Sequence, residues 1–232
     1  MDYIKENLKE IKDNIRTVCE KQGRDPESVT LIAVTKTIDE AVVNESLKLG
    51  IRDIGENKVQ EIERKYPAIS KGVKWHLIGH LQRNKVKYVI DKVAMIHSVD
   101  SLRLAQEIDK RAEGIGLVMD VLLQLNIARE ESKFGLDMEE LYRLIEDLSR
   151  LGHIRVRGLM TMAPFVENPE EVRWVFRKMK DIFEDLKLRD FENIDMEYLS
   201  MGMTNDYLVA LEEGANMLRI GTGIYGPRDY SK

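Results

Sequence analysis

Short apolar runs alternate with amphipathic segments along most of the chain. The runs are rich in Val, Ile and Leu, as buried strands are, whereas apolar residues in the intervening segments recur at helical spacing. Eight runs have the character of strands, at residues 30–36, 51–57, 75–80, 93–100, 117–127, 154–162, 196–202 and 216–226. Helix-like segments follow them, so the pattern predicts a series of β/α units.

A further helix is expected before the first strand. Its apolar residues share one helix face and are Ile4, Leu8, Ile11, Ile15 and Val18. Gly23 then marks its end, and Gly152 likewise ends the helix that follows the fifth strand. Asn168 and Pro169 are typical N-cap and first-turn residues, and they predict a long helix that continues through Leu186.

Eight strands that alternate with eight helical segments are typical of a (β/α)8 barrel. A doubly wound open sheet gives a similar alternation, usually with fewer strands. The length of 232 residues suits one barrel, which typically needs ~250 residues, and leaves no room for a second domain. We therefore predict an α/β fold, a single (β/α)8 TIM barrel with an extra N-terminal helix, as one domain over residues 1–232.

Charge and cysteine content narrow the class of protein. The formal net charge is -5, which argues against a general nucleic-acid binder. One cysteine, Cys19, allows neither a disulfide framework nor a zinc ribbon and is typical of a reducing compartment. The first residues lack the apolar core of a secretory signal, and no apolar run approaches the ~20 residues of a membrane span. We expect a cytoplasmic monomer with no nucleic-acid or membrane partner.

Lys36 is the first candidate for chemistry, because it directly follows the apolar run of the first strand. In barrels of this kind, function collects where strands end. A lysine that is desolvated there, near other cations, has a lowered pKa and a nucleophilic amine. The alternative is a lysine that extends to solvent or pairs with a loop carboxylate.

Glycine-rich turns follow the last two predicted strands. Ser200 and Gly202 follow the seventh, and Gly221, Thr222 and Gly223 follow the eighth. Barrel enzymes often bind phosphate in these two loops, where backbone N–H groups and hydroxyls approach the anion. Each turn alone could be a simple tight turn. Together with a first-strand lysine, they suggest a ligand with a phosphate at one end and an electrophilic carbon at the other, such as pyridoxal 5'-phosphate.

Arg219 lies two residues before Gly221 and therefore on the same face of the eighth strand. An arginine there can only donate to a pyridine nitrogen, which would stay unprotonated. That arrangement weakens the cofactor as an electron sink and suits racemase-like chemistry or plain holding. The alternative is a salt bridge inside the barrel with Glu197 or Glu56.

Histidines offer a rival site, since His76, His80 and His97 belong to neighbouring strands and could bind zinc. The H-E-x-x-H spacing is absent, so we expect packed and hydrogen-bonded histidines and no metal. Four methionines near the strand ends suit ordinary core packing, with a minor cofactor contact as the alternative. They are Met160, Met162, Met201 and Met203.

Taken in order, these segments resemble a known family. The motifs are TLIAVTKT, GENKVQE, WHLIGHLQRNK, HSVDS, NIAREESKFG, GLMTMAP, LSMGMTNDY and LRIGTGIYG. The chain is similar to the pyridoxal phosphate homeostasis proteins, single-barrel relatives of the alanine racemase N-terminal domain. The resemblance implies that Lys36 is the aldimine lysine and that Arg219 is the ring-nitrogen partner. It implies a phosphate cradle of Ser200, Gly221 and Thr222, and cofactor neighbours Asn57, His80 and Met201. Thr204 is a conservative variation from serine.

The resemblance also implies a cofactor-holding protein without clear catalytic turnover, one that contributes to intracellular supply of pyridoxal phosphate. Racemisation needs a proton acceptor on one face of the cofactor adduct and a donor on the other. Lys36 could serve one face, but the second domain and partner subunit that complete related enzymes have no place in this chain. Apoenzymes that need the cofactor are the expected recipients. The alternative is a weak racemase-like enzyme in which Tyr225 or His80 is the second base.

Overall fold

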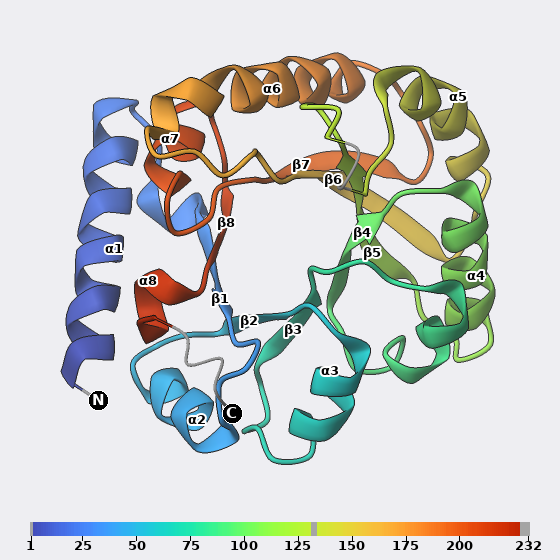
Figure 1. Cartoon of the computed structure of the whole chain (residues 1–232). Coiled ribbons are helices and arrows are strands. Elements are labelled where there is room, and N and C mark those ends of the chain that lie inside the picture. The colour runs from blue at the N-terminus through green and yellow to red at the C-terminus, as the bar shows by residue number, and fades with distance from the viewer. Residues whose placement is uncertain (1, 131–133, 228–232) are drawn as a thin grey trace.

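The computed structural model describes residues 2–130 and 134–227 and confirms the barrel. A closed sheet of parallel strands runs in chain order, and β8 pairs with β1 to complete it (Figure 1). The strands are β1 Thr30–Val34, β2 Asp53–Glu56, β3 Lys74–Leu77, β4 Met95–Val99, β5 Met119–Leu125, β6 Ile154–Thr161, β7 Ile194–Ser200 and β8 Met217–Ile220.

Helices surround the barrel and connect its strands (Figure 1). The α-helices are α1 Asp2–Lys21, α2 Glu40–Lys48, α3 Val59–Lys65, α4 Leu102–Glu113, α5 Met138–Leu148, α6 Arg173–Lys187, α7 Tyr207–Glu212 and α8 Thr222–Tyr225. Three short 3-10 helices are η1 Pro26–Ser28, η2 Arg83–Tyr88 and η3 Pro169–Val172. None of the helices in the described ranges combines the length and apolar character needed to cross a bilayer.

Several element boundaries differ from the sequence prediction. The expected helix from Asn168 is divided into η3 and α6, although the Asn168 side chain does cap η3 by accepting from the Glu170 N–H. The helix between β3 and β4 is the 3-10 helix η2. The predicted eighth strand ends at Ile220, because Gly221 leaves the extended conformation with φ -110 and ψ -81 and α8 begins at once.

Apolar side chains fill two regions. The larger lies between the sheet and the helices, and the smaller fills the inside of the barrel with Ile32, Met95, Leu122, Met160 and Met217. Met160 and Met201 are fully buried and pack in the core, as expected from the sequence. Side chains therefore fill the barrel interior, and a ligand can bind only at the C-terminal ends of the strands.

The extra N-terminal helix packs on the last elements of the chain. Figure 1 shows α1 beside α7 and α8 at one side of the barrel, and its predicted apolar face is buried. The Asn7 amide donates to the Ile224 carbonyl at 3.1 Å, and the Gln22 amide donates to the Glu212 carbonyl at 2.6 Å. Helix α1 and the helices α7 and α8 thus stabilise each other through packing and hydrogen bonds.

Candidate functional site

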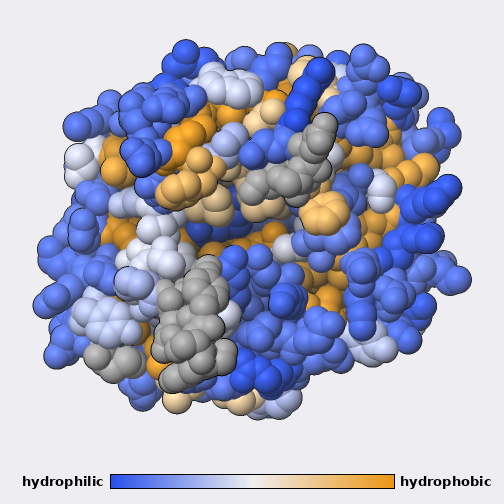
Figure 2. Space-filling model, in the orientation of Figure 1, coloured by the Kyte–Doolittle hydropathy of each residue, from blue (hydrophilic) through white to orange (hydrophobic). Residues whose placement is uncertain are grey.

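A cavity of about 530 Å³ opens where the strands end. Figure 2 shows a hollow near the centre of the face in view, with hydrophobic and hydrophilic residues at its edge. The lining comes from the ends of β1 and β8 and from the loops after β1, β2, β3, β6, β7 and β8. Of the eight cofactor-binding residues predicted from the sequence, five are among the lining residues, namely Lys36, Asn57, Arg219, Gly221 and Thr222.

Lys36 stands in the turn that follows β1, where Thr37 has the left-handed φ of 65. A buried ion pair holds this strand end in place. Lys65 donates to the Thr35 carbonyl at 2.7 Å and to Glu56 at 2.8 Å, and the Thr35 hydroxyl donates to the same Glu56 oxygen at 2.7 Å. Burial raises the pKa of Glu56 against the opposing effect of Lys65. The backbone just before Lys36 is therefore rigidly anchored.

Arg219 is a buried cation in the lining of the cavity, with only 3% of its surface exposed. It donates to the Ser200 hydroxyl at 2.5 Å and to the Thr161 carbonyl at 2.7 Å. Burial lowers its pKa to about 10, against the attraction of Asp206, so it remains charged at neutral pH.

The salt bridge considered for Arg219 on sequence grounds is wrong. Glu56 pairs with Lys65, and Glu197 pairs with Arg157 on the neighbouring strand. Within the described residues, Arg219 has no carboxylate at ion-pair distance. A desolvated guanidinium without a counter-ion is costly, so its position favours a cavity that receives an electron-rich acceptor.

The loops after β7 and β8 meet through hydroxyl groups. The Gly223 N–H donates to the Thr204 hydroxyl at 3.1 Å, and the Thr222 hydroxyl donates to Thr204 at 3.2 Å. A Cβ at Gly223 would lie 2.9 Å from Ile220 and 3.1 Å from Thr204, so a glycine is needed for this approach. Both threonines line the cavity, and together with the Gly221 turn they provide donors for an anion.

Thr204 is the residue that sequence reasoning undervalued. It was interpreted only as a conservative variation, yet it forms the contact between the two loops. Its place directly after the glycine-containing turn that follows β7 was the available signal. Asp206 stabilises the loop after β7, because its carboxylate accepts a hydrogen bond from the Met203 N–H at 2.6 Å.

Asn57 lines the cavity because two strand exits lie against each other. A Cβ on Gly79 would lie 2.3 Å from the Asn57 carbonyl oxygen, so only glycine allows this contact between the loops after β2 and β3. Met162 and Met203 also line the cavity, which makes the two outer methionines part of its wall.

Comparison with known proteins places the chain in a family. The model for "Alanine racemase, N-terminal domain" matches residues 7–229. The pyridoxal phosphate homeostasis protein of Aquifex aeolicus is 43% identical over 226 residues, which cover 97% of this chain and 98% of that protein. That of Escherichia coli K12 is 38% identical over 237 residues, covering 100% of both. The chain belongs to the pyridoxal phosphate homeostasis protein family.

A solved structure gives the same result for the fold. PipY of Synechococcus elongatus PCC7942, determined with pyridoxal phosphate bound, superposes with a TM-score of 0.84 at 32% identity, covering 96% of this chain and 100% of PipY. The likeness therefore extends over nearly the whole barrel of this family member.

Three residues that the family resemblance suggested lie away from the cavity lining. Ser200 is fully buried beneath Arg219, and Met201 is fully buried in the core. His80 turns to Asp100, at 3.3 Å, and its ring stacks on Phe134 with centroids 3.8 Å apart. The family motif NIAREESKFG includes residues 131–133, which lie outside the described part of the structure.

His76 and His97, the other two histidines considered as zinc ligands, are both engaged in hydrogen bonds. His76 and His97 contact each other through ring nitrogens 2.9 Å apart, and each ring has a further hydrogen-bond partner. Over residues 2–130 and 134–227, no group of three His, Cys, Asp or Glu side chains could hold a metal ion. Tyr225 is bonded to the Ser46 hydroxyl at 3.0 Å, and burial raises its pKa to about 12.

Proposed function

We propose that the chain binds pyridoxal phosphate through a Schiff base to Lys36 and contributes to the intracellular supply of this cofactor. One observation supports this most strongly: a buried guanidinium, with no carboxylate at ion-pair distance among the described residues, shares a single cavity with a lysine and a hydroxyl-lined glycine turn. The names of the Aquifex and Escherichia relatives and the cofactor found in PipY support the same ligand.

The residues present suit the three ends of the cofactor. Arg219 would donate a hydrogen bond to the pyridine nitrogen, because a guanidinium has donors and no acceptor. The pyridine nitrogen would therefore stay unprotonated. Thr204, Thr222 and the N–H groups of the glycine turn would hold the phosphate. The Lys36 amine would replace the aldehyde oxygen, which leaves as water. When bound, the cofactor supplies an electrophilic carbon and a conjugated ring.

The residues around this cavity favour a protein that holds the cofactor over an enzyme with catalytic turnover. Of the candidate acid–base residues, Tyr225 is buried against Ser46, and His80 faces Asp100 outside the lining. Lys36 is then the one candidate base from the sequence that lines the cavity of the described residues. Racemisation needs a second base on the opposite face of the cofactor.

We propose a monomeric, single-domain protein that passes the cofactor to apoenzymes.

The visible absorption of the purified protein tests Lys36. Lys36→Ala should abolish the visible band and the borohydride-trapped adduct, because no other lysine of the described residues lines the cavity. Lys58→Ala is the matched control, since Lys58 is an exposed lysine at the next strand end and should change neither. A visible band of wild-type intensity in Lys36→Ala would contradict the proposal.

The second candidate is a weak racemase-like enzyme, which the alanine racemase family match favours. A time course with single amino-acid enantiomers and loaded protein distinguishes the two. We expect no sustained turnover. Conversion at ordinary enzyme rates, of about 1 per second or faster, would favour the enzyme instead.

A further inference from the structure

Lys65, the last residue of α3, is a fully buried cation that joins three elements. Its ammonium donates to the Thr35 carbonyl at 2.7 Å and lies 2.8 Å from Glu56 Oε1 and 2.9 Å from Glu61 Oε2. An ammonium has three N–H donors, so each of them has an acceptor here. The end of β1, the end of β2 and helix α3 therefore meet at one nitrogen atom.

The Thr35 carbonyl also closes the turn that contains Lys36. Its oxygen accepts from the Ile38 N–H at 3.0 Å, so residues 35–38 form a β-turn with Lys36 in the second position. Thr37, in the third position, has the left-handed φ of 65 that a type II turn requires. Glycine is usual at that position, and a β-branched threonine with this φ is strained.

A strained turn persists only where the surrounding structure fixes it. The Thr35 N–H donates to the Gly55 carbonyl at 3.0 Å, which keeps Thr35 in register with β2. The Thr35 carbonyl belongs to the peptide group that joins Thr35 to Lys36, and Lys65 donates to it from outside the turn. Lys65 therefore fixes the orientation of the peptide group from which the Lys36 side chain extends into the cavity lining.

Stability alone does not explain a charge in this position. A buried ion pair gains little over apolar residues of similar volume, because both charges lose their hydration. One oxygen of the pair, Glu56 Oε2, is buried without a hydrogen-bond partner in the described residues, which adds to the cost. Despite desolvation, hydrogen bonding to Lys65 and its charge lower the pKa of Glu61, so Lys65 keeps a counter-ion at neutral pH.

We infer that Lys65 is a positioning residue, which holds the Lys36 turn in the geometry needed to bond the cofactor and is dispensable for the fold. This inference rests on the proposed Schiff base. In that step the Lys36 nitrogen bonds to the aldehyde carbon, and the aldehyde oxygen leaves as water with the two amine hydrogens. Without Lys65, the turn would adopt the competent geometry only part of the time, and the apparent covalent affinity would fall by that fraction.

Two ligands separate covalent from non-covalent binding. Pyridoxine 5'-phosphate has the same ring and phosphate but an alcohol in place of the aldehyde, so it cannot react with Lys36. Lys65→Met should bind it with unchanged affinity in calorimetric titration, since Lys65 is absent from the cavity lining and Asn57 is held separately against Gly79. The affinity for pyridoxal phosphate, titrated by the visible band, should fall about tenfold or more, because a hydrogen bond from a charged group is lost.

Two further variants separate positioning from a general effect on stability. Lys65→Met combined with Glu56→Gln removes both buried charges and should give the same result as Lys65→Met without leaving a carboxylate unpaired. Ile62→Val is the matched control, because Ile62 is fully buried in the same helix and its truncation leaves the contacts of Lys65 intact. It should lower Tm but leave the ratio of the two affinities at the wild-type value.

A ratio of the two affinities in Lys65→Met equal to that of wild type would overturn the inference. Failure of both Lys65 variants to fold would also overturn it, because Lys65 would then be required by the whole barrel. Wild-type protein that binds pyridoxine 5'-phosphate but forms no visible band with pyridoxal phosphate would instead refute the proposed Schiff base, and the inference with it.

Discussion

Arg219 illustrates how a single buried charge restricts what a cavity can bind. Its hydrogen bonds within the described residues go to a hydroxyl and a carbonyl, neither of which neutralises the guanidinium. Sequence reasoning predicted its inward direction from its position two residues before Gly221. Whether a glutamate would neutralise it depended on the register of β2 and β7, which no local pattern records.

The position of Ser200 differs from what its sequence motif suggested. Its family motif suggested a phosphate contact, but β7 runs through Ser200, so its side chain points into the barrel and lies beneath Arg219. Thr204, four residues further, lines the cavity instead. The sequence pointed to a loop that does line the cavity, but the residue at which the strand ends, and hence which hydroxyl faces the cavity, required the structure.

Thr204 provides the residue-scale prediction. Thr204→Val should weaken binding of pyridoxal phosphate by about tenfold or more, because a hydrogen bond to a charged group typically contributes about 1.5–3 kcal/mol. Equilibrium titration of the cofactor-free protein measures it. Thr204→Ser keeps the hydroxyl and should bind within about threefold of wild type. Equal affinity of the Val and wild-type proteins would remove Thr204 from the site.

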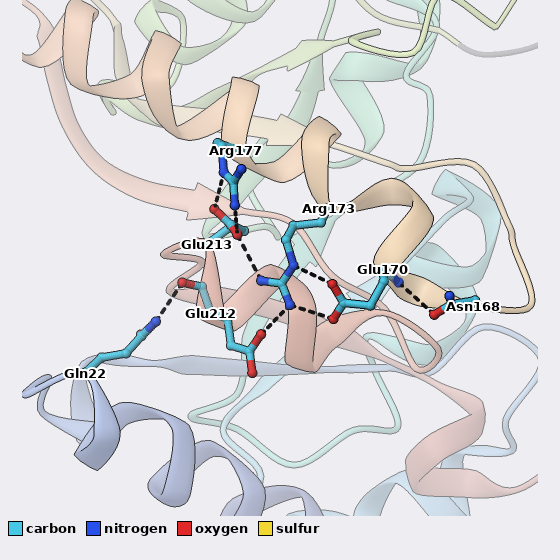
Figure 3. A network of polar contacts seen from close by, with 7 residues as sticks. All are labelled: Gln22, Asn168, Glu170, Arg173, Arg177, Glu212 and Glu213. Carbon is cyan, nitrogen blue, oxygen red and sulfur yellow. Dashed lines mark hydrogen bonds and ion pairs between the residues drawn. The ribbon is translucent and has the colours of Figure 1, made fainter.

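At the scale of elements, a network of ion pairs joins α6 to α7. Figure 3 shows Arg173 among three carboxylates, with Glu170 at 2.6 Å, Glu212 at 2.5 Å and Glu213 at 2.9 Å. Arg177 also contacts Glu213, at 3.1 Å. These pairs hold the helix that precedes β8, and the loop before that helix contains Thr204.

Arg173→Met should lower the free energy of unfolding by about 1 kcal/mol, or Tm by about 2–4 °C for a chain of this size. Thermal unfolding measures it. Arg143→Met should have no measurable effect, because its pair with Glu139 is exposed. A Tm for Arg173→Met equal to that of Arg143→Met would show that the network contributes nothing to stability.

The effect of Arg173→Met should depend on pH. Hydrogen bonding to Arg173 lowers the pKa of Glu170, and the pKa of Glu213 is lowered by Arg177 and Arg173 despite its burial. Because the folded-state values lie below the ordinary 4.5, this stabilisation is present above pH 4.5 and is lost as pH falls through the lowered values. The Tm difference from wild type should therefore shrink below that pH.

At the scale of the molecule, the alternation of apolar and amphipathic segments was enough to predict the barrel. Each β/α unit is a local pattern, and closure follows from the number of units. The strand ends were less predictable, as the early stop of β8 at Ile220 shows. Contacts between distant segments, such as that of His97 with Ser200, could not be predicted from local patterns at all.

Cofactor binding should stabilise the whole barrel. At a pyridoxal phosphate concentration of 100 times Kd, linkage predicts about 2.7 kcal/mol, or a rise in Tm of about 5–10 °C. Differential scanning calorimetry measures it. Pyridoxal, which lacks the phosphate, should produce a clearly smaller rise at the same concentration. Equal rises with the two compounds would mean that the Thr204 and Thr222 loops make no phosphate contact.

The position of α1 has a consequence for synthesis on the ribosome. This helix precedes every strand of the barrel in the sequence, but its buried face rests on α7 and α8, which follow β7 and β8. Its Asn7 and Gln22 amides bind carbonyls more than 180 residues away, with separations of 217 and 190. A domain generally folds as a unit during synthesis. Because α1 has no surface to dock on until α7 and α8 have been made, we expect docking of α1 to follow the synthesis of all eight strands.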